Sequence, residues 1–110
     1  MKTRSAKAKG RRLQNQIANA LRQAFDLHSD DVRPAVMGEQ GEDIKLSPAA
    51  RERFPYSVEA KNTERLNVWE AIRQAEANCG EHTPLVVFTR NRAKTYAIVE
   101  FGHFLTLVCK

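Results

Sequence analysis

The sequence predicts a single domain with a mixed α/β layer fold, and two observations lead to this prediction. The chain has 110 residues, of which 42% are hydrophobic, so it is long enough for one domain with its own core. Segments with apolar residues at helical spacing alternate with short runs whose pattern is typical of strands. The helical segments are 11–26 and 67–79, and the strand segments are 43–46, 56–60, 84–89 and 96–100. This order of elements is typical of a sheet covered by helices.

The first predicted helix covers about residues 11–26. Its apolar residues recur every three or four positions and form one hydrophobic stripe, while polar residues face the other way. The stripe consists of Leu13, Ile17, Leu21 and Phe25. After this helix, Ser29 and the two aspartates that follow it favour the start of a short helical turn, which Pro34 closes.

Glycine and proline residues divide the middle of the chain. The glycine-rich segment 38–41 breaks the chain before the strand at 43–46. Ser47 and Pro48 form a helix-start signal, because a hydroxyl can cap a helix whose first residue is proline. Pro55 ends this short helix, and the next strand follows directly.

The last part of the chain is expected to hold a helix and two strands. Asn67 is a suitable cap for the second long helix. The segment 84–89 is the most apolar of the chain and is predicted to be a fully buried strand. Residues 90–94 form a basic loop before the last predicted strand. The tail from 101 to 108 fits either a short helix or a further strand.

Positive charge is concentrated at the N-terminus. The first twelve residues carry six basic residues and no acid, whereas the other 98 hold twelve basic and thirteen acidic residues. The six are Lys2, Arg4, Lys7, Lys9, Arg11 and Arg12. We therefore expect residues 1–10 to form a basic arm that is disordered without a partner, and residues 11–110 to form the folded domain. A basic arm attracts polyanions by releasing their counterions, which makes nucleic acid a plausible partner.

The cysteines and the hydropathy pattern indicate the cellular compartment in which the protein is expected. Cys79 and Cys109 form no spaced cluster, so neither a zinc site nor a disulfide framework is predicted. Two free thiols fit the reducing cytoplasm better than secretion. No segment approaches the roughly 20 apolar residues that cross a bilayer, and no apolar run follows the basic N-terminus as in a signal peptide. We expect a cytoplasmic protein with no membrane partner.

Asp43 and the tripeptide Glu59-Ala60-Lys61 are the residues with the clearest chemical potential. Residues two apart on a strand share a face, so Glu59 and Lys61 are expected to point the same way. If the two strands pair like a hairpin, Asp43 and Glu59 can converge on one hard cation, Mg²⁺ or Mn²⁺, with the Ala60 backbone carbonyl as a further ligand. Such a cation activates water and offsets charge on a phosphate, and Lys61 can hold either group.

Two other interpretations of these residues stay open on spacing alone. Asp43-Ile44-Lys45 also matches an acid-x-lysine pattern, but it lacks an upstream acid at the end of a credible strand. Glu59 and Lys61 can equally form an ordinary ion pair on the solvated face of a sheet, and the spacing by itself favours this simpler explanation.

The wider context of these residues resembles the PD-(D/E)XK nuclease superfamily, and in particular small phage-encoded nucleases related to Holliday-junction resolvases. The resemblance extends from about Lys9 to Leu107. Its motifs are Gly10-Arg11-Arg12, Gly41-Glu42-Asp43-Ile44, Glu59-Ala60-Lys61, and a following helix with Trp69 and Gln74. It implies a mixed central β-sheet flanked by helices, the restriction-endonuclease-like core. It also implies Asp43 and Glu59 as metal ligands, Lys61 as the catalytic lysine, and Gln74 as a polar helix residue near the active site.

The sequence departs from this family at the metal site. Glu42 stands before Asp43 where proline is common, a change that the superfamily tolerates. Many relatives carry a metal-site glutamate on the first helix, where this chain offers the neutral residues Gln14, Asn15 and Gln16. Only one of Gln14 and Gln16 can face the site, and Gln14 is the preferred candidate. Either the site functions with fewer carboxylates, or Glu39 or Glu42 supports it from the glycine-rich segment.

DNA contacts are expected from two basic segments, with no motif that reads base sequence. The segments contribute Lys7, Lys9, Arg11 and Arg12 from the N-terminus, and Arg90, Arg92 and Lys94 from the predicted loop. Phosphate contacts of this kind position DNA without specifying its sequence. Trp69 can stack on a base, but on a helix a tryptophan is more often a core residue.

The sequence therefore predicts a metal-dependent DNA endonuclease that acts on branched or junction DNA. One active site per small chain and a two-stranded substrate favour a homodimer. If the protein is phage-encoded, it acts in the host cytoplasm. The alternatives are a non-catalytic nucleic-acid-binding protein that retains the fold, and an interaction module in which the Glu59–Lys61 pair is incidental.

Overall fold

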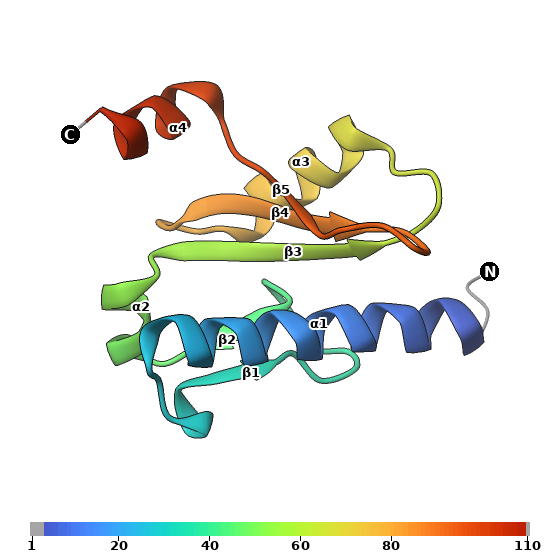
Figure 1. Ribbon diagram of the computed structural model, residues 1–110, viewed down its shortest axis with the longest axis horizontal. Helices are drawn as coiled ribbons and strands as arrows, with labels where there is room; N and C mark the ends of the chain where they lie inside the picture. The colour runs from blue at the N-terminus through green and yellow to red at the C-terminus, as the bar shows by residue number, and fades with distance from the viewer. Residues whose placement is uncertain (1–3, 110) are drawn as a thin grey trace.

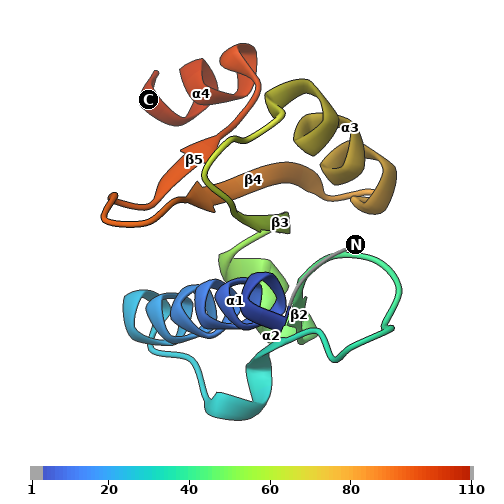
Figure 2. The same cartoon turned by 90° about the vertical axis from the view of Figure 1, so that its right-hand side faces the viewer.

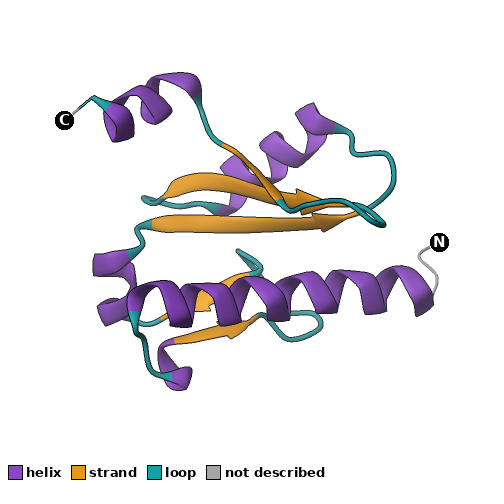
Figure 3. Ribbon diagram, in the orientation of Figure 1, coloured by secondary structure: helices purple, strands orange, loops and turns teal. Residues whose placement is uncertain are grey.

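Three layers make up the fold in the computed structural model, which describes residues 4–109: helix α1, a β-sheet, and helices α3 and α4 (Figures 1 and 2). The helices are α1 (Arg4–Phe25), α2 (Pro48–Arg53), α3 (Val68–Asn78) and α4 (Phe101–Val108), with a 3₁₀ turn η1 (Ser29–Asp31). The strands are β1 (Val32–Pro34), β2 (Ile44–Leu46), β3 (Tyr56–Asn62), β4 (Thr83–Thr89) and β5 (Tyr96–Ile98) (Figure 3). The predicted α/β class is confirmed.

Helix α1 begins earlier than the sequence predicted. Residues 4–10, expected to be part of a disordered arm, form its first turns, and Lys2 lies outside the described residues. Alanine and lysine are good helix formers, and this segment contains no proline. Asn62 also holds the segment to the sheet, because its side-chain amide donates to the Lys9 carbonyl over 2.9 Å. The expected boundary between arm and domain at residue 10 is therefore wrong for the described residues.

Helices α2 and α3 start where the sequence predicted. The Ser47 hydroxyl accepts a hydrogen bond from the Ala50 amide over 3.1 Å and caps α2. The Asn67 side chain accepts one from the Glu70 amide over 3.1 Å and caps α3. Strand β1 was not predicted; it pairs antiparallel with β2, and only three residues of each strand take part.

A mixed three-stranded sheet lies at the centre of the molecule. Strand β3 pairs with β4 in parallel, and β4 pairs with β5 antiparallel, so the strand order is β3-β4-β5. The register places Lys61, Phe88 and Tyr96 side by side in one row across the three strands. Glu59 and Val86 lie in the row two residues earlier, and therefore on the same face of the sheet.

The two faces of this sheet pack against different helices (Figure 2). Val58 and its partly buried neighbours Leu85 and Val87 belong to the hydrophobic cluster that includes α1. On the other face, Val86 belongs to the cluster that includes Ala71 and Ala75 of α3. Val58 and Ala60 of β3 thus belong to the core beneath α1, while Glu59 and Lys61 lie on the α3 side.

Two expectations about burial are wrong. Strand β4 was predicted to be fully buried, but only Val86 of its seven residues is buried, because β5 pairs with only three of them and the rest of that edge is uncovered. Trp69 was expected to be a core residue, but 80% of its surface is exposed. Helix α3 buries the small residues Ala71 and Ala75 instead, and Trp69 projects from its first turn.

The tail from 101 to 108, which the sequence left undecided, is helix α4. Glu100 caps it by accepting a hydrogen bond from the His103 amide over 2.9 Å. The His103 ring contacts the sheet through the Tyr56 hydroxyl, with 2.6 Å between Nε2 and Oη. The apolar residues at 101, 104, 105 and 108 lie on the exposed side of the helix. None of the helices within residues 4–109 combines the length and hydropathy needed to cross a membrane.

Candidate active site

Glu59 and Lys61 meet at the carboxyl end of β3. Their side chains point to the same face, and Lys61 Nζ lies 3.3 Å from Glu59 Oε2. Only 10% of the Glu59 side chain is exposed. A carboxylate this deeply buried is stable in its charged form only with a positive partner or a ligand. Lys61 is that partner, and a cation bound at the same carboxylate would also stabilise its negative charge.

Asp43 joins the same strand from the edge opposite β4. The Asp43 amide donates to the Val58 carbonyl over 2.9 Å, and the Ala60 amide donates to Asp43 Oδ2 over 2.7 Å. The two motif strands do not pair as a hairpin, the arrangement considered from the sequence, because β2 pairs with β1. Asp43 is the residue just before β2, and it bonds to β3 from there. Its carboxylate therefore bonds to the residue that lies between Glu59 and Lys61.

The oxygen atoms around Ala60 suit a hard divalent cation. Two carboxylates and a backbone carbonyl are ligands that Mg²⁺ and Mn²⁺ accept, with water completing the coordination. Across residues 4–109, no group of three or more histidine, cysteine, aspartate or glutamate side chains is placed to hold a metal. The residues present thus fit a cation that keeps several waters and is held by two acids.

A cleft of about 640 Å³ opens beside Lys61, between the first turns of α1 and α3. Its lining includes Lys9, Lys61, Asn62, Glu70 and Gln74. Gln74 was expected near the active site from the family resemblance, and it lies in the same cleft as Lys61. Its amide donates to Glu70 Oε1 over 3.3 Å.

Glu70 is a charged residue of this cleft that the sequence did not single out. The hydrogen bonds from Arg73 lower its pKa to about 2, and the charge of Lys61 acts in the same direction. Glu70 is therefore ionised at neutral pH, close to Lys61. Its position one helical turn before Gln74 is a signal that could have revealed it, because residues four apart share a helix face.

The residues that the sequence suggested as additional metal ligands differ in whether they lie near the cleft. Gln14 is half-buried one turn after Gly10, which lines the cleft, whereas Gln16 is exposed on the outer side of α1. Glu39 forms an ion pair with Arg33, and Glu42 forms one with Arg51. The hydrogen bond from Arg33 lowers the Glu39 pKa to about 2. Neither glutamate lines the cleft.

The competing motif at Asp43-Ile44-Lys45 is less well placed. Strand β2 pairs with β1, so Lys45 stands opposite Arg33. The Lys45 ammonium donates to the Gln40 carbonyl over 2.5 Å, in the glycine-rich segment. Lys61, in contrast, lines the cleft.

The two basic segments predicted from the sequence converge at one end of the molecule, at the carboxyl ends of β3 and β4 (Figure 1). Glu64 joins them: it accepts a hydrogen bond from the Asn91 amide over 2.7 Å and lies 3.6 Å from Lys9 Nζ. Lys9 is consequently only 17% exposed. The remaining basic residues of the two segments, Lys7, Arg11, Arg12, Arg90, Arg92 and Lys94, are exposed.

Comparisons with protein-family models, with curated proteins and with solved structures found no match for this chain. Evidence about function therefore comes from the residues around β3 themselves.

Proposed function

We propose that the protein is a Mg²⁺- or Mn²⁺-dependent DNA endonuclease of the PD-(D/E)XK type. The observation that carries the proposal is the hydrogen bond from the Ala60 amide to Asp43 Oδ2, because it holds one carboxylate beside Glu59 and Lys61. The mixed sheet between α1 and α3 is compatible with a restriction-endonuclease-like core.

Each motif residue has a distinct part in the proposed hydrolysis. Asp43, Glu59 and the Ala60 carbonyl would hold the cation. When bound there, the cation would polarise a phosphate oxygen and lower the pKa of a water ligand. Lys61 places a positive charge next to the phosphate and stabilises the negative charge that develops on it. Gln74 can orient a water or phosphate oxygen by hydrogen bonding from the cleft wall.

The proposed substrate is branched or junction DNA. Helix α1 and the β4–β5 loop carry exposed basic residues at the end of the molecule where β3 and β4 end (Figure 1), which is also where the cleft opens, and these residues can bind phosphates on both sides of it. Such contacts recognise the path of the backbone and not its base sequence. Selectivity then depends on the shape of the DNA.

We further propose that the enzyme acts as a homodimer through α4. Five apolar side chains of this helix are exposed: Phe101, Phe104, Leu105, Leu107 and Val108. Exposed apolar patches of several hundred Å² mark interaction surfaces, and a standard interface buries roughly 800 Å² on each partner. A second copy can cover this stripe with its own α4 across a two-fold axis.

The catalytic proposal is tested by removing one motif residue at a time. Glu59→Gln and Lys61→Ala should each lower metal-dependent DNA cleavage by about a hundredfold or more, because each removes charge that acts on the reacting phosphate or its cation. DNA affinity without metal should remain, since phosphate contacts elsewhere provide it. Cleavage of a labelled four-way junction and anisotropy with the same DNA measure the two properties.

Glu76→Gln is the matched control, because it makes the same chemical change at an exposed position of α3. Its cleavage rate should equal that of the wild type. Full activity in Glu59→Gln would reject the assignment of the active site.

One observation favours a second candidate function, a non-catalytic DNA-binding protein. Glu59 and Lys61 already neutralise each other, and within residues 4–109 no three acids gather at a metal site. Such a protein would bind DNA with a strong salt dependence, and Glu59→Gln would not weaken its binding of Mn²⁺, whereas the same substitution in the enzyme should weaken Mn²⁺ binding. Calorimetric titration of Mn²⁺ into both variants separates the two functions.

A further inference from the structure

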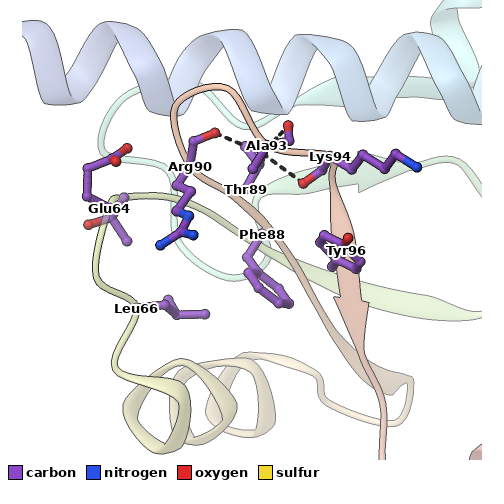
Figure 4. Close-up of a pocket in the computed structure, with 9 residues that line it drawn as sticks. Glu64, Leu66, Phe88, Thr89, Arg90, Ala93, Lys94 and Tyr96 are labelled. Atoms are coloured by element: carbon purple, nitrogen blue, oxygen red, sulfur yellow. Dashed lines mark hydrogen bonds between the residues drawn. The ribbon is translucent and has the colours of Figure 1, made fainter.

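A second pocket, of about 680 Å³, lies next to the catalytic cleft (Figure 4). Its lining includes Leu66, Phe88, Thr89, Arg90, Lys94 and Tyr96. Thr63, Glu64 and Leu66 line both this pocket and the cleft, so the two are adjacent. Its volume lies in the range of roughly 300 to 1,000 Å³ that is usual for ligand sites. We refer to it as the hairpin pocket, because the β4–β5 hairpin forms one wall.

Two aromatic residues stand next to each other in the hairpin pocket. Phe88 of β4 pairs with Tyr96 of β5, and their ring centroids are 6.0 Å apart with an interplanar angle of 33°. Tyr96 is 57% exposed, so much of its ring is free to make contacts. Exposed aromatic rings on a sheet are the surfaces on which proteins stack nucleic-acid bases.

The charges of the pocket suit a polyanion. Arg90 and Lys94 are exposed, and neither lies within 4.0 Å of a carboxylate oxygen of any residue in the described part of the chain. In Figure 4 the Arg90 side chain extends towards Leu66, while Lys94 extends to the other side of the hairpin. Glu64, the acid in the lining, is engaged by Asn91 and Lys9. Cationic and aromatic side chains together recognise phosphate and base.

The walls of the pocket are held in place without a ligand. The Thr89 hydroxyl lies 3.1 to 3.3 Å from the carbonyl oxygens of Arg90, Ala93 and Lys94 and so closes the hairpin loop (Figure 4). The Thr63 amide donates to the Thr89 carbonyl over 3.2 Å and ties the opposite wall to the same residue. A ligand therefore meets a preformed site and loses little free energy in ordering it.

The distance between the hairpin pocket and Lys61 indicates which nucleotide of a bound strand would reach the pocket. Lys61, Phe88 and Tyr96 lie in one row across β3, β4 and β5. Neighbouring strands are about 4.8 Å apart, so Tyr96 lies about 10 Å from Lys61 along this row. A strand whose phosphate is at Lys61 would bring the base of the same or the next nucleotide to the pocket. A base within a duplex is stacked on both faces and would first have to be extruded at a cost in free energy, whereas an unpaired base can enter without that cost.

We propose that the hairpin pocket receives an unpaired base of the cut DNA strand, next to the scissile phosphate. This inference rests on the proposed nuclease function and narrows its substrate to DNA with an unpaired nucleotide at the cleavage position. Overhangs, flaps and the crossing points of branched DNA supply such nucleotides, and an intact duplex does not.

The test compares Tyr96→Ala with Tyr96→Phe on two DNAs, an intact duplex and the same duplex with a short single-stranded overhang. Affinities are measured by fluorescence anisotropy in EDTA, so no cleavage takes place. Tyr96→Ala should weaken binding of the overhang DNA by about tenfold, as expected for the loss of one base–aromatic stack, and should leave duplex affinity unchanged. Tyr96→Phe keeps the ring and should bind both DNAs like the wild type.

A 2-aminopurine as the unpaired base gives a direct readout, since its fluorescence falls on stacking. It should be quenched by the wild type and by Tyr96→Phe, and not by Tyr96→Ala. Trp69→Ala, which removes an exposed aromatic residue outside the pocket, is the control and should quench like the wild type.

The outcomes separate this inference from the proposed function. Equal effects of Tyr96→Ala on both DNAs, or no effect on either, would overturn the pocket as a base site even if the wild type cuts DNA. A selective loss of overhang binding in a protein that cuts no DNA with Mg²⁺ or Mn²⁺ would support the pocket and reject the nuclease.

Discussion

Among single residues, Gln14 is the one at which an added carboxylate is expected to raise the proposed metal affinity. Asp43 and Glu59 are the two acids next to Ala60, while Gln14 is half-buried on the side of α1 that packs on the sheet. An amide can accept a hydrogen bond from a water ligand, but it contributes no net charge to attract a cation. We therefore expect the protein to need a high concentration of divalent metal for activity.

Gln14→Glu should lower the concentration of Mg²⁺ and of Mn²⁺ that gives half-maximal cleavage. The added charge lies on the inner side of α1, one turn from Gly10 at the cleft. Cleavage rates measured over a titration of each metal give the value. Gln16→Glu, which adds the same charge on the exposed outer side, should leave the metal requirement unchanged. If Gln14→Glu behaves like this control, α1 does not border the metal.

The sequence could predict some of the site residues because their relation is local. Glu59 and Lys61 share a face by the period of a strand, and the structure places them 3.3 Å apart. The bond from Ala60 to Asp43 could not be predicted, because it depends on the path of the segment 35–43. Gly38 and Gly41 have φ values of 84° and 91°, which other residues rarely adopt, and they direct this path.

Among the helices and strands too, features that depend on neighbouring residues were predicted, and features that depend on distant segments were not. The caps at Ser47 and Asn67 depend on side chains next to the helix they start, and both are confirmed. Strand β1 has three residues and exists through its pairing with β2, so its own sequence carries little signal. The start of α1 was placed too late because positive charge was taken to indicate disorder, whereas Asn62 and Glu64 fix that turn.

Because the basic residues of α1 are ordered on a helix, the contribution that we propose for them in DNA binding can be measured one residue at a time. Lys7→Ala and Arg11→Ala should each reduce the slope of log affinity against log salt by about 1, since each loses roughly one phosphate contact. Anisotropy titrations from low to moderate salt give the slope. Arg53→Ala removes an exposed charge on α2, at the opposite end of the molecule, and should not change it (Figure 1). Equal slopes in all variants would exclude α1 from the DNA interface.

For the whole molecule, the orientation of α4 is the most consequential feature. His103 faces the sheet through its contact with Tyr56, while Phe101 is 71% exposed. A surface helix normally buries its apolar stripe, and here the stripe faces outwards. Sequence periodicity shows that such a helix is amphipathic, but it cannot show which side meets the domain.

Phe101→Asp should convert the proposed dimer into a monomer. The charge would be buried within an α4–α4 contact, where it has no partner. The fold should be preserved, because aspartate at the N-terminal turn of a helix interacts favourably with the helix dipole. Sedimentation velocity over a range of protein concentrations gives the mass. Met37→Asp alters an exposed apolar residue elsewhere and should remain dimeric. A wild type that sediments as a monomer at every concentration would contradict the dimer.

The alternation of residues along β3 makes a chain with the wrong strand register unstable. Val58 and Ala60 point into the core beneath α1, and Glu59 and Lys61 point to the α3 side. A slip of one residue in the pairing with β4 would exchange the two sets. It would bury a carboxylate and an ammonium group in the core and place two small apolar side chains at the cleft. Such a chain would be unstable, because its core would hold unpartnered charges, so the buried face of β3 selects against errors of register.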